Sequence, residues 1–312
     1  MKRTKFYFFV ALAMLLLGQT AKAQVLKYST GTWNEDTLGN HRAVVKVTAK
    51  SNALLAHIDW RRRDHHPEKM DVVVVEASSG KRINNVFRVN INREFGELIF
   101  QAPSTGLYYF YYMPHKLGKG NYPKVYYNTP IDLAEKEWLE GNKLSAQPLT
   151  KDQLSKFQRV TASQIESIDA FNSFFPMEVI ASKAETASLL KNNADNSYLI
   201  FPEYRQYSIR MTNDIPQRWA MRGAKANLND TVQKGEYYSF QVGLWANAKS
   251  FQNVAILFSD LKSARNTIKS GNFTCFNTEG FDSEGEYFEK KCSVAQNYVL
   301  PISRNVLSIR KA

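Results

Sequence analysis

The sequence predicts a mainly β protein, with two β-sandwich domains joined by a helical connector and the second sandwich looking incomplete. Apolar and polar residues alternate in short segments of the first and last thirds of the chain, which is typical of half-buried antiparallel strands. Between these regions the period changes and helix-capping patterns appear. Among the 312 residues, 44% are hydrophobic and 13% aromatic, which is enough to build large cores and excludes a disordered protein.

The chain begins with a pattern typical of a signal peptide. Three basic residues come first, an apolar run follows over residues 6–17, and Ala21 and Ala23 supply the small side chains before a cleavage site. The run is shorter than the ~20 residues that a membrane-spanning helix needs. We therefore expect removal of residues 1–23, no transmembrane anchor after cleavage, and an exported protein, periplasmic or extracellular, of a Gram-negative bacterium.

The net charge limits the partners that the chain is expected to bind. The formal charge of +12 falls to +8 once the four basic residues of the signal peptide are removed. A basic chain can bind nucleic acid, but export argues against that partner. The densest basic run is Arg61-Arg62-Arg63, and Asp64 and Glu68 follow it closely. We expect this cluster to be solvated or internally paired rather than an anion site.

Residues 24–130 are expected to form the first β-sandwich. Val45 and Val47 alternate with polar residues, and Phe87, Val89 and Ile91 do the same. Further strands are expected at 72–75, 98–100 and 107–113, with turns at 78–80 and 104–106. This spacing, with no helical period between the strands, is typical of a sandwich of roughly 100 residues.

Residues 131–197 are expected to form the helical connector. Thr150 with Gln153, and Ser182 with Glu185, are capping-box patterns ahead of apolar residues. The apolar stretch 174–180 suggests a strand that interrupts the helices. Because the connector is too apolar for a floppy linker, we expect it to pack on its neighbours.

Residues 198–312 are expected to form the second sandwich. Tyr238, Phe240, Val242 and Leu244 alternate with smaller or polar residues. Further apolar runs lie at 254–258, 273–276 and 294–299, but the last segment, 301–312, has no clear alternation. This domain therefore looks truncated.

Two cysteines, Cys275 and Cys292, lie 17 positions apart. In an exported chain oxidation is permitted, and the pair favours a disulfide that would contribute about 3 kcal/mol. Metal binding is the weaker alternative, because no CxxC pattern or neighbouring His accompanies the thiols. We expect no metal site and no cofactor.

No common catalytic motif is present in the sequence. A nucleophile elbow, a Gly-rich phosphate loop and an H-E-x-x-H helix are all missing. Asp282, Glu284 and Glu286 form the densest acidic group, which is more often solvated than catalytic. Asp59 and Asp64 flank Trp60 and the arginines, where salt bridges at a strand end are the favoured interpretation.

Aromatic residues suggest carbohydrate binding. Trp and Tyr rings stack on the apolar faces of sugars while neighbouring polar groups hydrogen-bond the hydroxyls. The candidates are Trp33, Trp60, Tyr109 and Tyr111. Alternate members of the run Tyr108–Tyr112 must point to opposite faces of a strand, so one set lies in the core. The other set can form a binding platform or a domain interface.

Two stretches resemble the first domain of exported bacterial proteins described as glycoside hydrolase domain-containing. They are Ile58–Asp64 with Pro67–Lys69, and Tyr111–Pro114. A second region is similar to the N-terminal β-sandwich of glycoside hydrolase family 123-like proteins. Its matching segments are Phe201–Glu203, Ile209–Met211, Pro216–Trp219, Gly235–Gly243 and Phe258–Leu261.

The resemblance implies a glycan partner that contains an amino sugar. In that family an Asp-Glu pair on a following (β/α)-barrel assists the 2-acetamido group of the substrate, and nothing in this chain matches that pair. We therefore expect the non-catalytic N-terminal part of a secreted glycoside hydrolase-like protein. The alternative is a stand-alone secreted carbohydrate-binding or adhesion module, and a third hypothesis is an enzyme that uses the acids Asp282 to Glu286.

Overall fold

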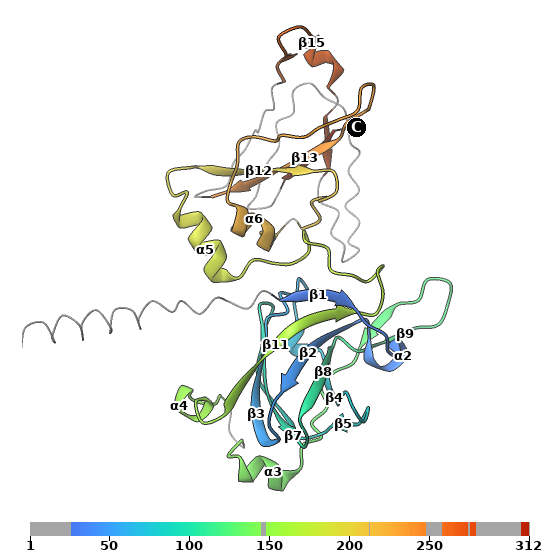
Figure 1. The fold of residues 1–312 in the computed structure, drawn as a ribbon, viewed down its shortest axis with the longest axis vertical. Coiled ribbons are helices and arrows are strands. Elements are labelled where there is room, and N and C mark those ends of the chain that lie inside the picture. Colours follow the sequence, from blue (N-terminus) through green and yellow to red (C-terminus); the bar gives the residue numbers. More distant parts are fainter. Residues whose placement is uncertain are drawn as a thin grey trace, which may run out of the picture.

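The computed structural model describes residues 26–144, 148–211, 213–247, 258–273, 275–278 and 307–311, and for the last two segments only the backbone. The protein is mainly β, with one large and nearly closed sheet and a second, smaller sheet (Figure 1). The first part contains β1 (Lys27–Thr30), α2 (Glu35–Leu38), β2 (His41–Val47), β3 (Ser51–Ile58), η1 (Pro67–Lys69), β4 (Val72–Glu76), β5 (Arg82–Ile83), β6 (Val86–Ile91), β7 (Gly96–Ala102), β8 (Gly106–Tyr112), β9 (His115–Leu117), β10 (Val125–Tyr127), α3 (Lys136–Gly141), α4 (Lys151–Leu154) and β11 (Gln158–Ser167). The second part contains α5 (Lys183–Lys191), β12 (Tyr198–Tyr204), α6 (Gln217–Arg222), β13 (Phe240–Ala246), β14 (Leu261–Lys262), β15 (Thr267–Ile268), η2 (Ser270–Asn272), β16 (Cys275–Thr278) and β17 (Leu307–Lys311).

The nine-stranded sheet has the order β5-β4-β8-β2-β11-β3-β7-β6, and β1 pairs with β11. Strand β11 connects its two halves. The first residues of β11 pair in parallel with β3, and the last residues pair antiparallel with β2, with a register shift between Ala162 and Gln164. The sheet therefore bends at β11, and its two halves enclose one core.

This core confirms the alternation predicted for the first part. Inward-facing residues of β2, β3, β7, β8 and β11 form one cluster: Ala43, Val45, Val47, Leu54, Ala56, Ile58, Leu98, Phe100, Ala102, Tyr108, Phe110, Tyr112, Ala162 and Ile165. Strands β2, β3, β7 and β8 each contribute every second residue, as a pleated strand requires. In β11 the register shift separates the two core residues by three positions. In β6 a register shift between Arg88 and Asn90 changes the pattern. Phe87 and Val89 consequently face a different cluster from Ile91.

The opposite side of β3 and β7 is covered by the segment that contains α3 and α4. Trp138 and Leu144 pack on Leu55 and Ile99. Helix α3 thus places the ring of Trp138 on this side of the sheet. The Thr150–Gln153 capping box also forms, because each side chain satisfies a backbone N–H of the other residue.

The helical connector predicted for residues 131–197 is not confirmed. Strand β11 lies inside this range and completes the first sheet, which therefore extends to Ser167 rather than ending near residue 130. The apolar stretch 174–180 is not a strand, and only Ile180 forms an isolated bridge, to Pro216. It packs on both neighbours as expected, since Phe174 contacts the first core and Met177 the second.

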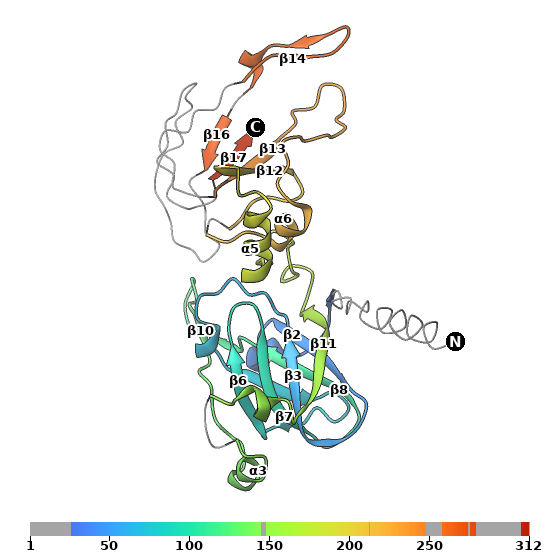
Figure 2. The same cartoon turned by 90° about the vertical axis from the view of Figure 1, so that its left-hand side faces the viewer.

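The second part has a four-stranded sheet with the order β12-β13-β17-β16. Helices α5 and α6 lie between this sheet and the nine-stranded sheet in both views (Figures 1 and 2). The predicted capping box of Ser182 and Glu185 begins α5. A second sandwich is not confirmed. Residues 307–311 form strand β17, in a segment where the sequence pattern predicts no strand.

The predicted strand at 238–244 is present as β13, but its buried face carries Gln241 and Gly243. Gly243 brings the backbone against the ring of Trp219, because a Cβ at this position would lie 2.2 Å from the ring. Trp219 in turn stacks on Phe201 with ring centroids 4.3 Å apart. The sequence alternation of Phe240, Val242 and Leu244 therefore identifies the strand but not the face that packs on α6.

None of the helices in the described parts of the chain has the length and apolarity that a membrane span requires.

Candidate functional site

The outer face of β8 carries two of the predicted aromatic site residues. Tyr108, Phe110 and Tyr112 point into the core, so Tyr109 and Tyr111 point outward. Across the sheet, Tyr111 lies opposite Arg42 of β2 and Val73 of β4. Tyr109 lies opposite residues 44 and 75 of the same two strands. The pleat therefore gathers Arg42, Val73, Tyr109 and Tyr111 on one outer face.

Arg42 lies at the centre of this face and is almost fully buried. Its Nε donates to Oε2 of Glu166 at 2.6 Å, and its Nη1 donates to the hydroxyl of Tyr111 at 2.9 Å. The guanidinium carbon lies 3.6 Å from the ring centroid of Tyr109 and 4.4 Å from that of Trp33. Arg42 is therefore held between two aromatic rings and a carboxylate, which fixes its position.

Trp33 covers this face from the loop that leads into α2. Its indole Nε1 donates to the carbonyl of Gly39 at 2.7 Å, and its ring meets Tyr111 edge-on with centroids 5.6 Å apart. Gly31 permits the close approach, since a Cβ there would lie 2.8 Å from both the Trp33 ring and Glu166. Trp33 remains half-buried, so part of its ring is available from solvent.

These residues line an open groove of about 460 Å³, called the Arg42 groove below. Val73, Val75 and Ala77 form an apolar wall, while Thr32, Thr37 and Arg82 supply polar groups at the rim. The Arg82 side chain is 38% exposed and lies 3.7 Å from Asp71. Burial raises the pKa of Tyr111, although the hydrogen bond from Arg42 acts in the opposite direction. Tyr111 therefore keeps its hydroxyl proton at neutral pH.

Trp60, the fourth predicted binding residue, is 1% exposed and belongs to the core. Its indole Nε1 donates to the carbonyl of Asn92 at 2.7 Å. The ring lies against the backbone of Gly96, where a Cβ would be 2.3 Å from it. The structure therefore corrects the expectation that Trp60 stacks on a sugar.

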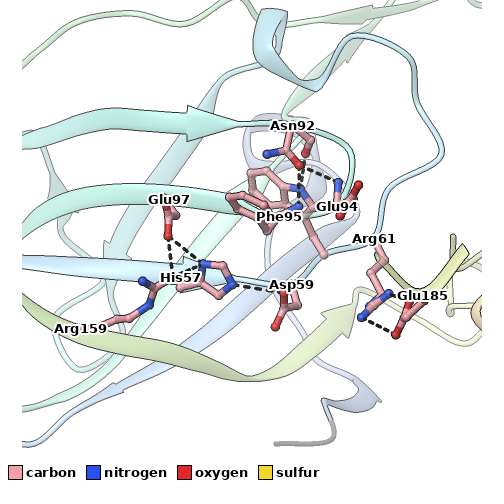
Figure 3. A network of polar contacts seen from close by, with 10 residues as sticks. His57, Asp59, Arg61, Asn92, Glu94, Phe95, Glu97, Arg159 and Glu185 are labelled. Carbon is pink, nitrogen blue, oxygen red and sulfur yellow. Dashed lines mark hydrogen bonds and ion pairs between the residues drawn. The ribbon is translucent and has the colours of Figure 1, made fainter. Parts of the chain in front are cut away.

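The arginine cluster is internally paired, as predicted. Arg61 pairs with Glu185 at 2.6 Å, Arg62 with Asp64 at 2.8 Å, and the Nη1 of Arg63 lies 3.2 Å from Glu178. The Arg61 pair joins the end of β3 to the first turn of α5 (Figure 3).

A second ionic group lies on the surface of β3, β7 and β11. His57 lies between Asp59 and Glu97, at 3.2 Å and 3.1 Å, and Arg159 contacts both His57 and Glu97 (Figure 3). The hydrogen bond from His57 lowers the pKa of Asp59. Each carboxylate thus faces a cationic or donor group, which agrees with the predicted salt bridges at this strand end.

Other predicted site residues cannot be placed. Asp282, Glu284, Glu286 and Cys292 lie outside the described residues, and for Cys275 in β16 only the backbone is described. Within the described residues, no three His, Cys, Asp or Glu side chains are grouped so as to bind a metal ion.

Residues 31–168 match the model of the family described as "Glycoside hydrolase 123, N-terminal domain". Residues 31–168 form a glycoside hydrolase 123-like N-terminal domain. No curated protein and no solved structure gives a significant match. The sequence resemblance predicts the family's β-sandwich in residues 198–312, whereas the family model matches residues 31–168, in the first β-region.

The C-terminal limit of the glycoside hydrolase 123-like domain agrees with the fold. The matched range begins just before Trp33 and ends at the close of β11, the strand that completes the nine-stranded sheet. It contains every residue of the Arg42 groove. Sequence reasoning found Trp33, Tyr109 and Tyr111 but missed Arg42 and Glu166. The similarity to a glycoside hydrolase domain therefore covers residues 31–168, and the candidate site lies within this range.

Proposed function

We propose that this chain is the non-catalytic N-terminal part of an exported glycoside hydrolase-related protein. In this proposal residues 1–23 direct export, Cys275 and Cys292 form a disulfide, and the Arg42 groove holds glycan for a catalytic barrel that these 312 residues do not contain. One observation carries the proposal. Trp33 meets Tyr109 and Tyr111, which lie far from it in sequence, in one open groove of a glycoside hydrolase 123-like domain.

The chemistry of the groove suits a sugar ring. Exposed parts of Trp33 and Tyr109 offer flat apolar surface to the C–H faces of a sugar, and Thr32, Thr37 and Arg82 offer hydrogen bonds to its hydroxyls. Arg42 is already paired with Glu166, so it acts as a rigid support for the rings rather than as a free cation. A neutral sugar, including an N-acetylated amino sugar, suits a groove that has apolar ring surfaces and polar rim groups.

Binding to neutral and N-acetylated oligosaccharides tests the groove. The purified chain should bind members of such a glycan panel, and Trp33→Ala and Tyr109→Ala should each weaken affinity about tenfold or more, because aromatic anchors carry much of the binding energy. Tyr237→Ala is the matched control, since that ring is 95% exposed and lies in the second part. Unchanged affinity in both groove variants would exclude this site.

A turnover assay tests the non-catalytic role. The purified chain should release no nitrophenol from an amino-sugar glycoside, whereas measurable hydrolysis that survives repurification would overturn the proposal. Sequencing the gene beyond codon 312 gives independent information. A downstream barrel with adjacent Asp and Glu supports the proposal, and a stop followed by intergenic DNA favours a stand-alone binding module.

A further inference from the structure

The hairpin formed by β9 and β10 exposes large side chains on both of its faces. Leu117 pairs opposite Val125, and Lys116 pairs opposite Tyr126. Leu117 is 64% exposed, Tyr126 59%, and Tyr122 in the connecting loop 95%. The hairpin extends away from the nine-stranded sheet (Figure 1). Exposed apolar and aromatic side chains that are grouped on one element are typical of a binding surface. A two-stranded hairpin is also only marginally stable in water by itself, so binding of a partner would stabilise it.

The hairpin is also purely basic. Between residues 115 and 131 the sequence has no Asp or Glu, and it has three lysines, Lys116, Lys119 and Lys124, all exposed. Within the described part of the chain, none of the three ammonium groups has a carboxylate at ion-pair distance. The acidic residues Glu35 and Asp36 belong to α2, which packs against β9 at the base of the hairpin. Since none of the three lysines forms an ion pair with either acid, the strands and the loop present net positive charge.

Lysines and tyrosines are interleaved in a way that suits an acidic polymer of sugars. Lys116 and Tyr126 are a cross-strand pair, so their Cβ atoms lie about 5 Å apart on one face. Tyr rings can stack on sugar faces while neighbouring ammonium groups pair with carboxylate or sulfate groups. Protein interfaces, by contrast, are depleted in Lys at their buried centres.

We propose that the β9–β10 hairpin is a second binding surface, which takes acidic polysaccharides that carry carboxylate or sulfate groups. The inference rests on the proposed function only in taking glycan as the partner class, because the hairpin shares no residue with the lining of the Arg42 groove. In this proposal the Arg42 groove binds a neutral sugar ring, and the hairpin binds the charged groups of an acidic polysaccharide.

Binding of the full chain to polygalacturonate and to dextran sulfate tests the hairpin, with dextran as the neutral polymer of the same backbone. The wild-type chain should bind both acidic polymers, and binding should weaken as NaCl screens the charges. The triple variant Lys116→Ala, Lys119→Ala, Lys124→Ala should bind about tenfold more weakly, since it loses three exposed charge contacts. Tyr122→Ala should also weaken binding and leave the fold unchanged, because its ring is almost fully exposed.

The matched control is the triple variant Lys50→Ala, Lys151→Ala, Lys191→Ala, which removes the same charge from exposed sites elsewhere. The inference is overturned if the wild-type chain binds neither acidic polymer, or if both triple variants lose affinity equally. It is also overturned if the chain binds vesicles containing anionic lipid but neither polymer. Trp33→Ala should keep full affinity for the acidic polymers, so a failure of the groove and a failure of the hairpin can be told apart.

Discussion

Removing the carboxylate of Glu166 is expected to destabilise the glycoside hydrolase 123-like domain strongly. The side chains of Arg42 and Glu166 are only 9% and 12% exposed, and their closest atoms are 2.6 Å apart. Glu166→Ala leaves the guanidinium buried between the rings of Trp33 and Tyr109 without its counter-charge. Breaking a buried pair in this way costs about 3–5 kcal/mol. For a domain of this size that corresponds to a fall in Tm of roughly 10 °C.

Thermal unfolding of the full chain at pH 7 measures this effect, and hydrogen exchange of the β2 amides assigns it to the nine-stranded sheet. Glu35→Ala is the control, because it removes an exposed acid from α2 and should shift Tm little. The double variant Arg42→Met, Glu166→Met should be more stable than Glu166→Ala, because no unpaired charge remains. If Glu166→Ala unfolds within 2 °C of the wild type (roughly 1 kcal/mol or less), the ionic pair does not support the groove.

Two further predictions concern the second part of the chain. Gly243→Ala should lower the free energy of unfolding by about 1–3 kcal/mol, because the new methyl group would overlap the buried ring of Trp219. Urea unfolding measures this loss. Gly271→Ala is the control and should change the free energy of unfolding little, because the space around Gly271 is open. The pKa of Glu185 is below its ordinary value of 4.5, because the hydrogen bonds from Arg61 and from the helix start outweigh the opposing effect of burial. The resulting stability is complete above pH 4.5 and is lost as the pH falls through the lower, folded-state pKa. Glu185→Gln keeps the capping box but not the charge, so its Tm should fall less than that of the wild type as the pH is lowered below 4.5. Equal slopes of Tm against pH would contradict the pairing.

Local patterns allowed the sequence to predict several elements correctly. The period of two in β8 separates Tyr109 and Tyr111 from the core residues, and this separation follows from strand geometry alone. The capping boxes at Thr150 and Ser182 form because each depends on residues only three positions apart. Such features need no knowledge of distant contacts.

Features that depend on distant contacts were missed. Strand β11 is rich in polar residues, and its place in the sheet is decided by β2 and β3 rather than by its own pattern. Arg42 and Glu166 are 124 positions apart, so no local signal connects them. Trp60 is a candidate binding residue because Trp rings stack on sugar faces, but its burial depends on Gly96 in another strand.

The position of β11 has a consequence for synthesis of the protein. Strands β2 and β3 leave the ribosome roughly 100 residues before the strand that lies between them. Until β11 emerges, the nascent polypeptide presents two open sheet edges, which are sites of aggregation and of pairing with other chains. Closure also joins residues that are far apart in sequence, which slows folding. A fragment that stops near residue 130 would keep both edges open, so we expect it to aggregate, whereas one that continues through Ser167 should give a soluble fold.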